Sequence, residues 1–316
     1  MIMEGTVIRN TGSSYIVRTQ DGAEIPCKIK GNFRIKGIRT TNPVAVGDIV
    51  DIRPGDADDS LITAIHPRRN YIIRRSSNLS KESHIIAANI DGVCLVATLF
   101  HPVTSTTFID RFLATAEAYG IDATLVLNKC DLCAGDPERE EYLEAVTYLY
   151  SSIGYKVVHT SAETGEGIDT LRDILADRTT LMSGNSGVGK TSLINRLIPG
   201  LDLRTAAISA VHDTGMHTTT FSEMFDLPAP GGRIIDTPGV KGFGTVDMET
   251  AEVAHYFPEI FRLSADCRYN NCTHTHEPGC AVRAALDEQR IAQSRYASYL
   301  SILEDIAGDS KYRKAY

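Results

Sequence analysis

The chain has 316 residues, of which 42% are hydrophobic, and a formal net charge of −8 at pH 7. This length suits two or three domains, each with a core of its own. The first ten residues lack the apolar run of a signal peptide, and the longest apolar stretch covers about half of a membrane span. Composition therefore argues against a secreted or membrane-embedded protein and predicts a cytoplasmic one without a membrane partner. The seven cysteines are unevenly spaced, which argues against a disulfide framework.

The net charge hides an asymmetry along the chain. Residues 1–85 hold 13 Lys and Arg against 9 Asp and Glu, a net +4, whereas the remainder holds 19 against 31, a net −12. A polyanion would therefore meet the N-terminal part first, in particular the run RRNYIIRR from Arg68 to Arg75. On charge alone, a solvated loop explains this run equally well.

Hydrophobic patterning divides the chain into three kinds of structure. Residues 4–65 are short alternating runs broken by turn residues, which predicts a small antiparallel barrel of roughly five strands. From residue 91, strand patterns alternate with apolar residues at helical spacing, which predicts a doubly wound parallel sheet. The strands are expected at 91–99, 123–128, 155–161, 179–184, 221–227 and 232–239, and the helices at 106–120, 138–153, 167–177 and from 190 onward. Beyond about residue 248 the pattern is helical.

A glycine-rich loop carries the strongest chemical signal. GNSGVGKT, which starts at Gly184, matches G-x-x-x-x-G-K-[ST] and lies between an expected strand and an expected helix. Its glycines let backbone N–H groups face phosphate oxygens at a helix N-terminus. Lys190 would reach the outer phosphates, and Thr191 would offer its hydroxyl to Mg²⁺. The predicted nucleotide contacts of this loop are Gly184, Asn185, Ser186, Gly187, Val188, Gly189, Lys190, Thr191 and Ser192.

A second motif, NKCD, predicts which base is bound. The Asp131 carboxylate can accept hydrogen bonds from guanine N1–H and the 2-amino group, and adenine cannot supply both donors. Asn128 and Lys129 complete the motif, while Ser161 and Ala162, after the next expected strand, would support the base. The pattern C-x-x-C from Cys130 to Cys133 overlaps this motif, and we interpret it as incidental.

Two further segments predict magnesium and γ-phosphate contacts. In DTPG, Asp236 would bind a magnesium water and the Gly239 N–H would face the γ-phosphate. In HTTT, Thr218 or Thr219 would reach the metal from a loop that precedes this strand. His217 either positions the attacking water or only packs against the loop.

The residue after DTPG is Val240, which cannot orient a water as glutamine does. We therefore expect slow intrinsic turnover that a partner accelerates. The predicted catalytic set is Lys190, Thr191, Asp236, Gly239 and His217.

The order of these motifs differs from that of an ordinary GTPase, because NKCD precedes the phosphate loop by 56 residues. If the sheet is assembled as usual, joining the old termini and opening new ones between the DTPG strand and the base-reading strand explains the order. The sequence therefore predicts a circularly permuted GTPase.

A cysteine cluster near the C-terminus predicts a metal site. Cys267, Cys272 and Cys280, with His274 between them, give the spacing C-x4-C-x-H-x5-C, and His276 is an alternative ligand. Thiolate and imidazole ligands in this ratio suit one structural Zn²⁺ ion.

Taken together, NKCD ahead of GNSGVGKTSL, then HTTT, DTPGV and DCRYNNCTHTHEPGC, resemble the RsgA (YjeQ/EngC) family of ribosome-small-subunit-dependent GTPases over essentially the whole chain. The resemblance implies an OB-fold RNA-binding domain (1–68), a permuted GTPase domain (69–245) and a helical zinc-binding domain (246–316). It also implies that His274 is the ligand rather than His276. Two departures are Met216, where the family usually has Arg or Lys, and Gly187, where potassium-dependent relatives have Asn.

The implied function is late maturation of the small ribosomal subunit by a monomer that binds its rRNA and hydrolyses GTP to GDP and phosphate, stimulated by the subunit. An alternative is a GTP-gated RNA-binding or anti-association factor in which hydrolysis only drives release. A signalling or trafficking GTPase would leave the barrel and the cysteine cluster without a role.

Overall fold

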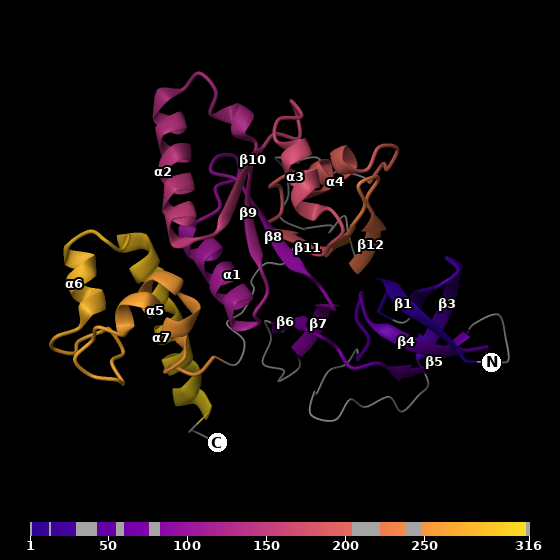
Figure 1. Ribbon diagram of the computed structural model, residues 1–316, viewed down its shortest axis with the longest axis horizontal. Helices are drawn as coiled ribbons and strands as arrows, with labels where there is room; N and C mark the ends of the chain where they lie inside the picture. Colours follow the sequence, from indigo (N-terminus) through magenta and orange to yellow (C-terminus); the bar gives the residue numbers. More distant parts are fainter. Residues whose placement is uncertain are drawn as a thin grey trace.

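A computed structural model of the protein describes residues 2–12, 14–29, 43–54, 60–75, 83–203, 222–237 and 248–313. Four of the predicted site residues, His217, Thr218, Thr219 and Gly239, lie outside these ranges. Met216 and Val240 lie outside them as well. In Figure 1 the central sheet lies between the N-terminal strands on the right and the C-terminal helices on the left.

The N-terminal strands form the predicted barrel. They are β1 (Met3–Asn10), β2 (Tyr15–Thr19), β3 (Glu24–Ile29), β4 (Ile49–Arg53) and β5 (Ser60–Ile65), in the order β1-β2-β3-β5-β4. Pairing of β1 with β4 closes the barrel, whose core contains Val7, Val17 and Ile52. The expectation of a purely antiparallel barrel is wrong in one place, because β3 and β5 run parallel.

The predicted doubly wound sheet is confirmed. Its strands are β8 (Gly92–Ala97), β9 (Ala123–Asn128), β10 (Lys156–Thr160), β11 (Thr179–Gly184), β12 (Ser222–Asp226) and β13 (Arg233–Asp236). The order is β10-β9-β8-β11-β13-β12, and only β12 is antiparallel to its neighbour in this part. Pairing of β12 with β1 joins this part to the barrel in one sheet, which the sequence did not predict.

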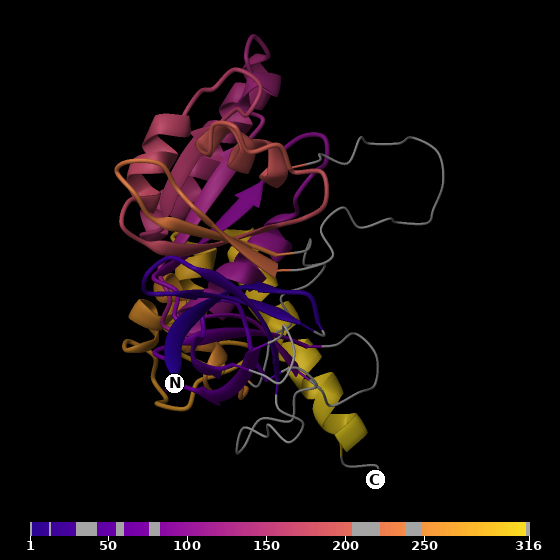
Figure 2. The same cartoon turned by 90° about the vertical axis from the view of Figure 1, so that its right-hand side faces the viewer.

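Helices cover both faces of the sheet because its central strands are apolar on both sides. Helices α1 (Thr106–Ala118) and α2 (Pro137–Ile153) pack on one face, through residues such as Phe112 and Tyr150. Helices α3 (Ile168–Leu175) and α4 (Lys190–Leu197) pack on the other, through Leu171 and Leu193. Figure 2 shows helices α2, α3 and α4 above the barrel.

The hairpin of β6 (Tyr71–Arg75) and β7 (Ser83–Ala88) links the barrel to the sheet. Arg68, just before it, is 8% exposed and pairs with the fully buried Asp48 at 2.6 Å. This arginine therefore holds the barrel together and is not free to meet a polyanion, so the basic run contains at least one buried arginine.

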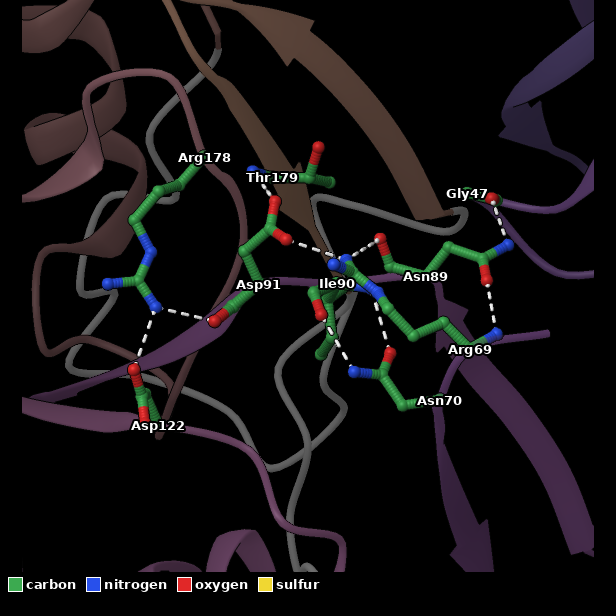
Figure 3. A network of polar contacts seen from close by, with 9 residues as sticks. All are labelled: Gly47, Arg69, Asn70, Asn89, Ile90, Asp91, Asp122, Arg178 and Thr179. Carbon is green, nitrogen blue, oxygen red and sulfur yellow. Dashed lines mark hydrogen bonds and ion pairs between the residues drawn. The ribbon is translucent and has the colours of Figure 1, made fainter.

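A polar network fastens this junction to the amino-terminal edge of the sheet (Figure 3). Arg69 donates to Asp91 at 2.6 Å, and the other oxygen of Asp91 accepts from the backbone N–H of Thr179 at 2.8 Å. Asn89 donates to the carbonyl of Gly47 in the barrel at 2.9 Å. The barrel is thus held by side chains as well as by the β1–β12 pairing.

The C-terminal part is helical, as predicted. It contains the short helix η2 (Val253–Tyr256), α5 (Pro258–Ser264), α6 (Ala281–Asp287) and α7 (Gln293–Arg313) around a core of its own. It packs on α1 through a buried ionic cluster, in which Arg295 donates to Glu259 at 2.6 Å and to Asp110 at 2.9 Å. Among the described residues, no helix is long and apolar enough to cross a membrane.

Candidate nucleotide site and metal cluster

Parallel strands bring the sequence motifs to one edge of the sheet. Asn128 ends β9, Thr160 ends β10, Gly184 ends β11 and Asp236 ends β13. Because neighbouring parallel strands end on the same side, these four segments meet although 108 residues separate the first from the last. This is the edge at which open α/β sheets bind ligands.

The glycine-rich loop fits closely between this edge and α4. A Cβ on Gly184 would lie 2.4 Å from the carbonyl oxygen of Val96, and one on Gly189 would lie 2.4 Å from Asn128 Nδ2. Gly189 also has φ +88°, a conformation that favours glycine. Val188 is buried, whereas Asn185, Ser186 and Gly187 form the accessible part of the turn. Thr191 and Ser192 follow in the first turn of α4.

Lys190 and Asp236 form the charged centre of the site. Lys190 Nζ lies 3.9 Å from Asp236 Oδ1, and the two side chains are 11% and 3% exposed. Burial raises the pKa of Asp236 to about 6. The positive charge of Lys190 opposes this rise, and the negative charge of Glu223 adds to it. Burial also lowers the pKa of Lys190. Asp236 Oδ1 is buried without a hydrogen-bond partner among the described residues. A buried carboxylate oxygen with a cation 3.9 Å away but no hydrogen bond suits a site completed by a hydrated cation.

Asn128 connects the NKCD motif to the glycine-rich loop. Its Nδ2 donates to the carbonyl of Val188 at 2.8 Å, and its Oδ1 accepts from Thr160 Oγ1 at 3.1 Å and from the Ala162 N–H at 3.3 Å. Lys129 has φ +64° and directs its ammonium to the carbonyl of His101 at 2.7 Å. The two motifs are therefore one constellation, despite their reversed order in the chain.

Asp131 is held in place by the segment after β10. Ser161 Oγ donates to Asp131 Oδ1 at 2.5 Å and accepts from the backbone N–H of Thr164 at 3.1 Å. Cys130 and Cys133 are both buried, and burial raises the pKa of the Cys130 thiol to about 12. A thiol with so little thiolate is a poor nucleophile, which favours the interpretation of this C-x-x-C pattern as incidental.

The predicted metal ligands also meet. One ligand atom from each of Cys267, Cys272, His274 and Cys280 lies within 4.8 Å of the others, so this cluster could hold a metal ion. His276 is exposed and instead contacts Thr275 Oγ1 through Nδ1 at 2.8 Å. The structure therefore groups His274, and not the alternative His276, with the three thiols.

Sequence reasoning missed the residues that hold these loops. Arg196 on α4 donates to the carbonyls of Ala162 and Glu163, both at 2.8 Å, which fixes the loop after β10 against helix α4. Glu277 accepts from the backbone N–H groups of Thr273 and Thr275, which shapes the loop around His274. Arg196 carries no local signal because its partners precede it by 34 and 33 residues.

Comparisons with known proteins agree with this geometry. The family described as RsgA GTPase matches residues 65–246, and the RsgA N-terminal domain matches residues 4–62. Curated relatives named small ribosomal subunit biogenesis GTPase RsgA include one from Bacteroides fragilis, 60% identical over 99% of this chain and 100% of the relative. One from Porphyromonas gingivalis is 59% identical over the same shares.

Two solved structures share the fold across nearly the whole chain. YjeQ from Thermotoga maritima is 33% identical with a TM-score of 0.75, covering 98% of this chain and 99% of that one. YloQ, described as a circularly permuted GTPase, is 29% identical with a TM-score of 0.70, covering 98% and 96%. Circular permutation explains both the order of the motifs along the chain and their meeting at one edge of the sheet. This chain belongs to the RsgA GTPase family, with the permuted strand order that the sequence predicts.

Proposed function

We propose that the protein hydrolyses GTP to GDP and phosphate and acts in late maturation of the small ribosomal subunit. The observation that carries this proposal is the bridge from Asn128 to Val188, Thr160 and Ala162. It joins a guanine-specific carboxylate to a phosphate loop, and neither alone would define a GTP site.

In this proposal each part of the site has a separate task. Asp131, supported by Ser161 and Ala162, selects guanine, and the loop from Gly184 to Ser192 holds the phosphates. Lys190 neutralises phosphate charge, while Thr191 and Asp236 would hold Mg²⁺, which supplies further neutralisation. The buried Asp236 oxygen, which lacks a hydrogen bond among the described residues, supports this assignment. Gly239, His217, Thr218 and Thr219 complete the proposed set from outside the described residues.

We further propose that the C-terminal cluster holds one structural zinc ion. His274 Nδ1 lies 3.6 Å from Cys267 Sγ and 3.5 Å from Cys280 Sγ. Zinc bonds of about 2.3 Å to sulfur and 2.1 Å to nitrogen, at tetrahedral angles, require a sulfur–nitrogen separation of about 3.6 Å. Four protein ligands leave no open position for a substrate, so the ion would be structural.

The partner in this proposal is the small ribosomal subunit with its rRNA, bound by a monomer. Support comes from the names of the relatives, which match 99% of this chain. Three hydrophobic clusters, centred on the barrel, the sheet and the C-terminal helices, support three units at 1–68, 69–245 and 246–316, with Ile8, Val46 and Ala114 each contributed to the cluster of a neighbouring unit.

The test is GTP turnover by the purified protein with and without purified small subunits. We expect slow turnover alone, a large acceleration with subunits, and no competition by ATP. A protein that prefers ATP would refute the guanine assignment, whereas equal rates with and without subunits would remove the ribosome from the proposal and leave the GTPase.

A further inference from the structure

Strand β1 belongs to the barrel and to the nucleotide-binding sheet at once. Val7 lies in the barrel core, while the next residue, Ile8, packs with Met224 and Ile235 in the core of the sheet. Neighbouring residues of a regular strand point to opposite faces, and a β-bulge lies between Val7 and Arg9 in the pairing with β2. The barrel is therefore anchored to the sheet at Ile8, immediately before Arg9.

Arg9 stands at one end of a row of three charged residues. It is the register partner of Glu223 on β12, and Glu223 is the register partner of Asp236 on β13. Directly paired residues in antiparallel strands share a face, so the three side chains lie on the same side of the sheet. Arg9 Nε donates to Glu223 Oε1 at 2.7 Å, and a second guanidinium nitrogen contacts the same oxygen.

Glu223, the middle residue of the row, adds an unfavourable negative charge near the nucleotide site. Around Asp236 the described charged groups are Lys190 and Glu223, and the Thr237 backbone N–H also donates to it. Glu223 therefore adds a second negative charge at an edge that, in the proposed function, receives the phosphates of GTP. Arg9 is the cation with which Glu223 forms an ion pair.

We propose that Arg9 is a positioning residue of the nucleotide site: by neutralising Glu223 it lets the anionic triphosphate bind beside Asp236, so affinity depends on the barrel being docked on β12. This inference rests on the proposed GTP-binding function. Arg9 touches no reacting atom and acts through Glu223. A positive charge of the barrel therefore offsets a negative charge at a site on the neighbouring domain.

The chain offers a matched control on the same two elements. Arg18 on β2 pairs with Asp226, at the other end of β12, at 2.5 Å. Asp226 is the register partner of Arg233 and not of Asp236. Arg18→Gln thus breaks a barrel-to-β12 ion pair, together with the pair between Arg18 and Glu24 inside the barrel, without exposing a negative charge beside the nucleotide site. Asp226 keeps Arg233 as a second cation.

The experiment measures equilibrium affinity for a fluorescent non-hydrolysable GTP analogue and for GDP in the presence of Mg²⁺, together with the thermal unfolding midpoint. Arg9→Gln should weaken triphosphate binding by about three- to tenfold, and GDP binding less, because the bare Glu223 repels the more charged ligand more strongly. Glu223→Gln should bind as tightly as the wild type or more tightly. The double variant should return to wild-type affinity, and Arg18→Gln should match the wild type.

A purely structural role for the ion pair predicts a different pattern. Arg9→Gln and Glu223→Gln break the same contact, so both would then weaken binding and lower the unfolding midpoint together, and the double variant would not recover. That result, or an Arg9→Gln affinity equal to that of the wild type, overturns the inference. Failure of the wild-type protein to bind the GTP analogue would instead refute the proposed function on which the inference rests.

Discussion

At the scale of single residues, the position of Asp131 leads to a prediction about which nucleotide base the protein binds. Its carboxylate, which accepts from Ser161, would pair with two guanine donors. Asp131→Asn replaces an acceptor by an amide that can also donate, so it should weaken GTP binding by at least about 100-fold and favour XTP, whose base has a carbonyl in place of the 2-amino group. Competition between GTP and XTP for the protein measures this change.

A neighbouring aspartate provides the control for that substitution. Asp136 caps the N-terminus of α2 by accepting from the Arg139 N–H at 3.3 Å, and asparagine caps helices equally well. Asp136→Asn should therefore leave nucleotide preference and stability unchanged. Unchanged preference in Asp131→Asn as well would show that this carboxylate does not read the base.

A second residue-scale prediction separates the two candidate histidine ligands. His274→Ala should abolish stoichiometric zinc binding, because it removes one of four clustered ligand atoms. His276→Ala should keep one zinc ion per chain, because this side chain is exposed and bonded to Thr275. Metal analysis of the purified variants checks both, and loss of zinc in His276→Ala would contradict the assignment.

At the scale of elements, the contact of α7 with α1 and α5 depends on a buried cation. Arg295 and Asp110 are both fully buried, and Arg295 Nε also donates to Glu259. Arg295→Met would leave these carboxylates without their cation, which should cost about 3 to 5 kcal/mol. Arg290→Met is the control, because its pair with Glu288 is exposed on both sides and should contribute less than about 1 kcal/mol. Chemical unfolding of both variants measures the difference.

The same cluster predicts how the deficit changes with pH. Burial raises the pKa of Asp110, and Arg295 opposes that rise. Without Arg295, the pKa of Asp110 in the folded state rises further above its value in the unfolded state. The contribution of Asp110 to stability is then fully present below the unfolded-state pKa and is lost as pH rises through the folded-state pKa. The deficit of Arg295→Met should therefore shrink when unfolding is measured at pH 5 instead of pH 8, and a deficit that grows on acidification would be inconsistent with this origin.

The sequence predicted the elements better than the contacts between them. Local patterns were sufficient for the phosphate loop, because GNSGVGKT carries its strand, turn and helix within a few residues. Arg68 was misjudged as part of a basic surface, since its partner Asp48 lies 20 residues away and its burial depends on the closed barrel. Arg295 was overlooked for the same reason, because Asp110 precedes it by 185 residues. Pairing of β12 with β1 joins residues more than 200 positions apart, next to a bulge between Val7 and Arg9 that no periodicity marks.

At the scale of the whole molecule, the sheet is linked to its two flanking parts in different ways. The barrel is attached along strands, through β1 and β12 and the polar network around Asp91. The C-terminal part is attached through α1, which contributes Phe112 to the core of the sheet and Ala114 to the core of the C-terminal helices. Helix α1 is therefore shared by two cores, and the barrel region contributes Ile8 and Val46 to the first of them.

This arrangement predicts how far the effect of metal removal extends. The loop that holds His274 is tied to α7 by Tyr296, which donates to the His274 carbonyl at 2.7 Å, and α7 packs on α1. Chelating the metal, or Cys272→Ser, should loosen the loop and then α7 and α1, with hydrogen-exchange protection falling by about tenfold or more there. Strand β3 of the barrel should keep its protection, because its apolar residues Ile25, Cys27 and Ile29 belong to the barrel core and not to the core that contains Phe112 of α1. An effect confined to residues 267–280 would show that α1 does not couple the two cores, and an equal loss of protection in the barrel would show that the chain unfolds as a single unit.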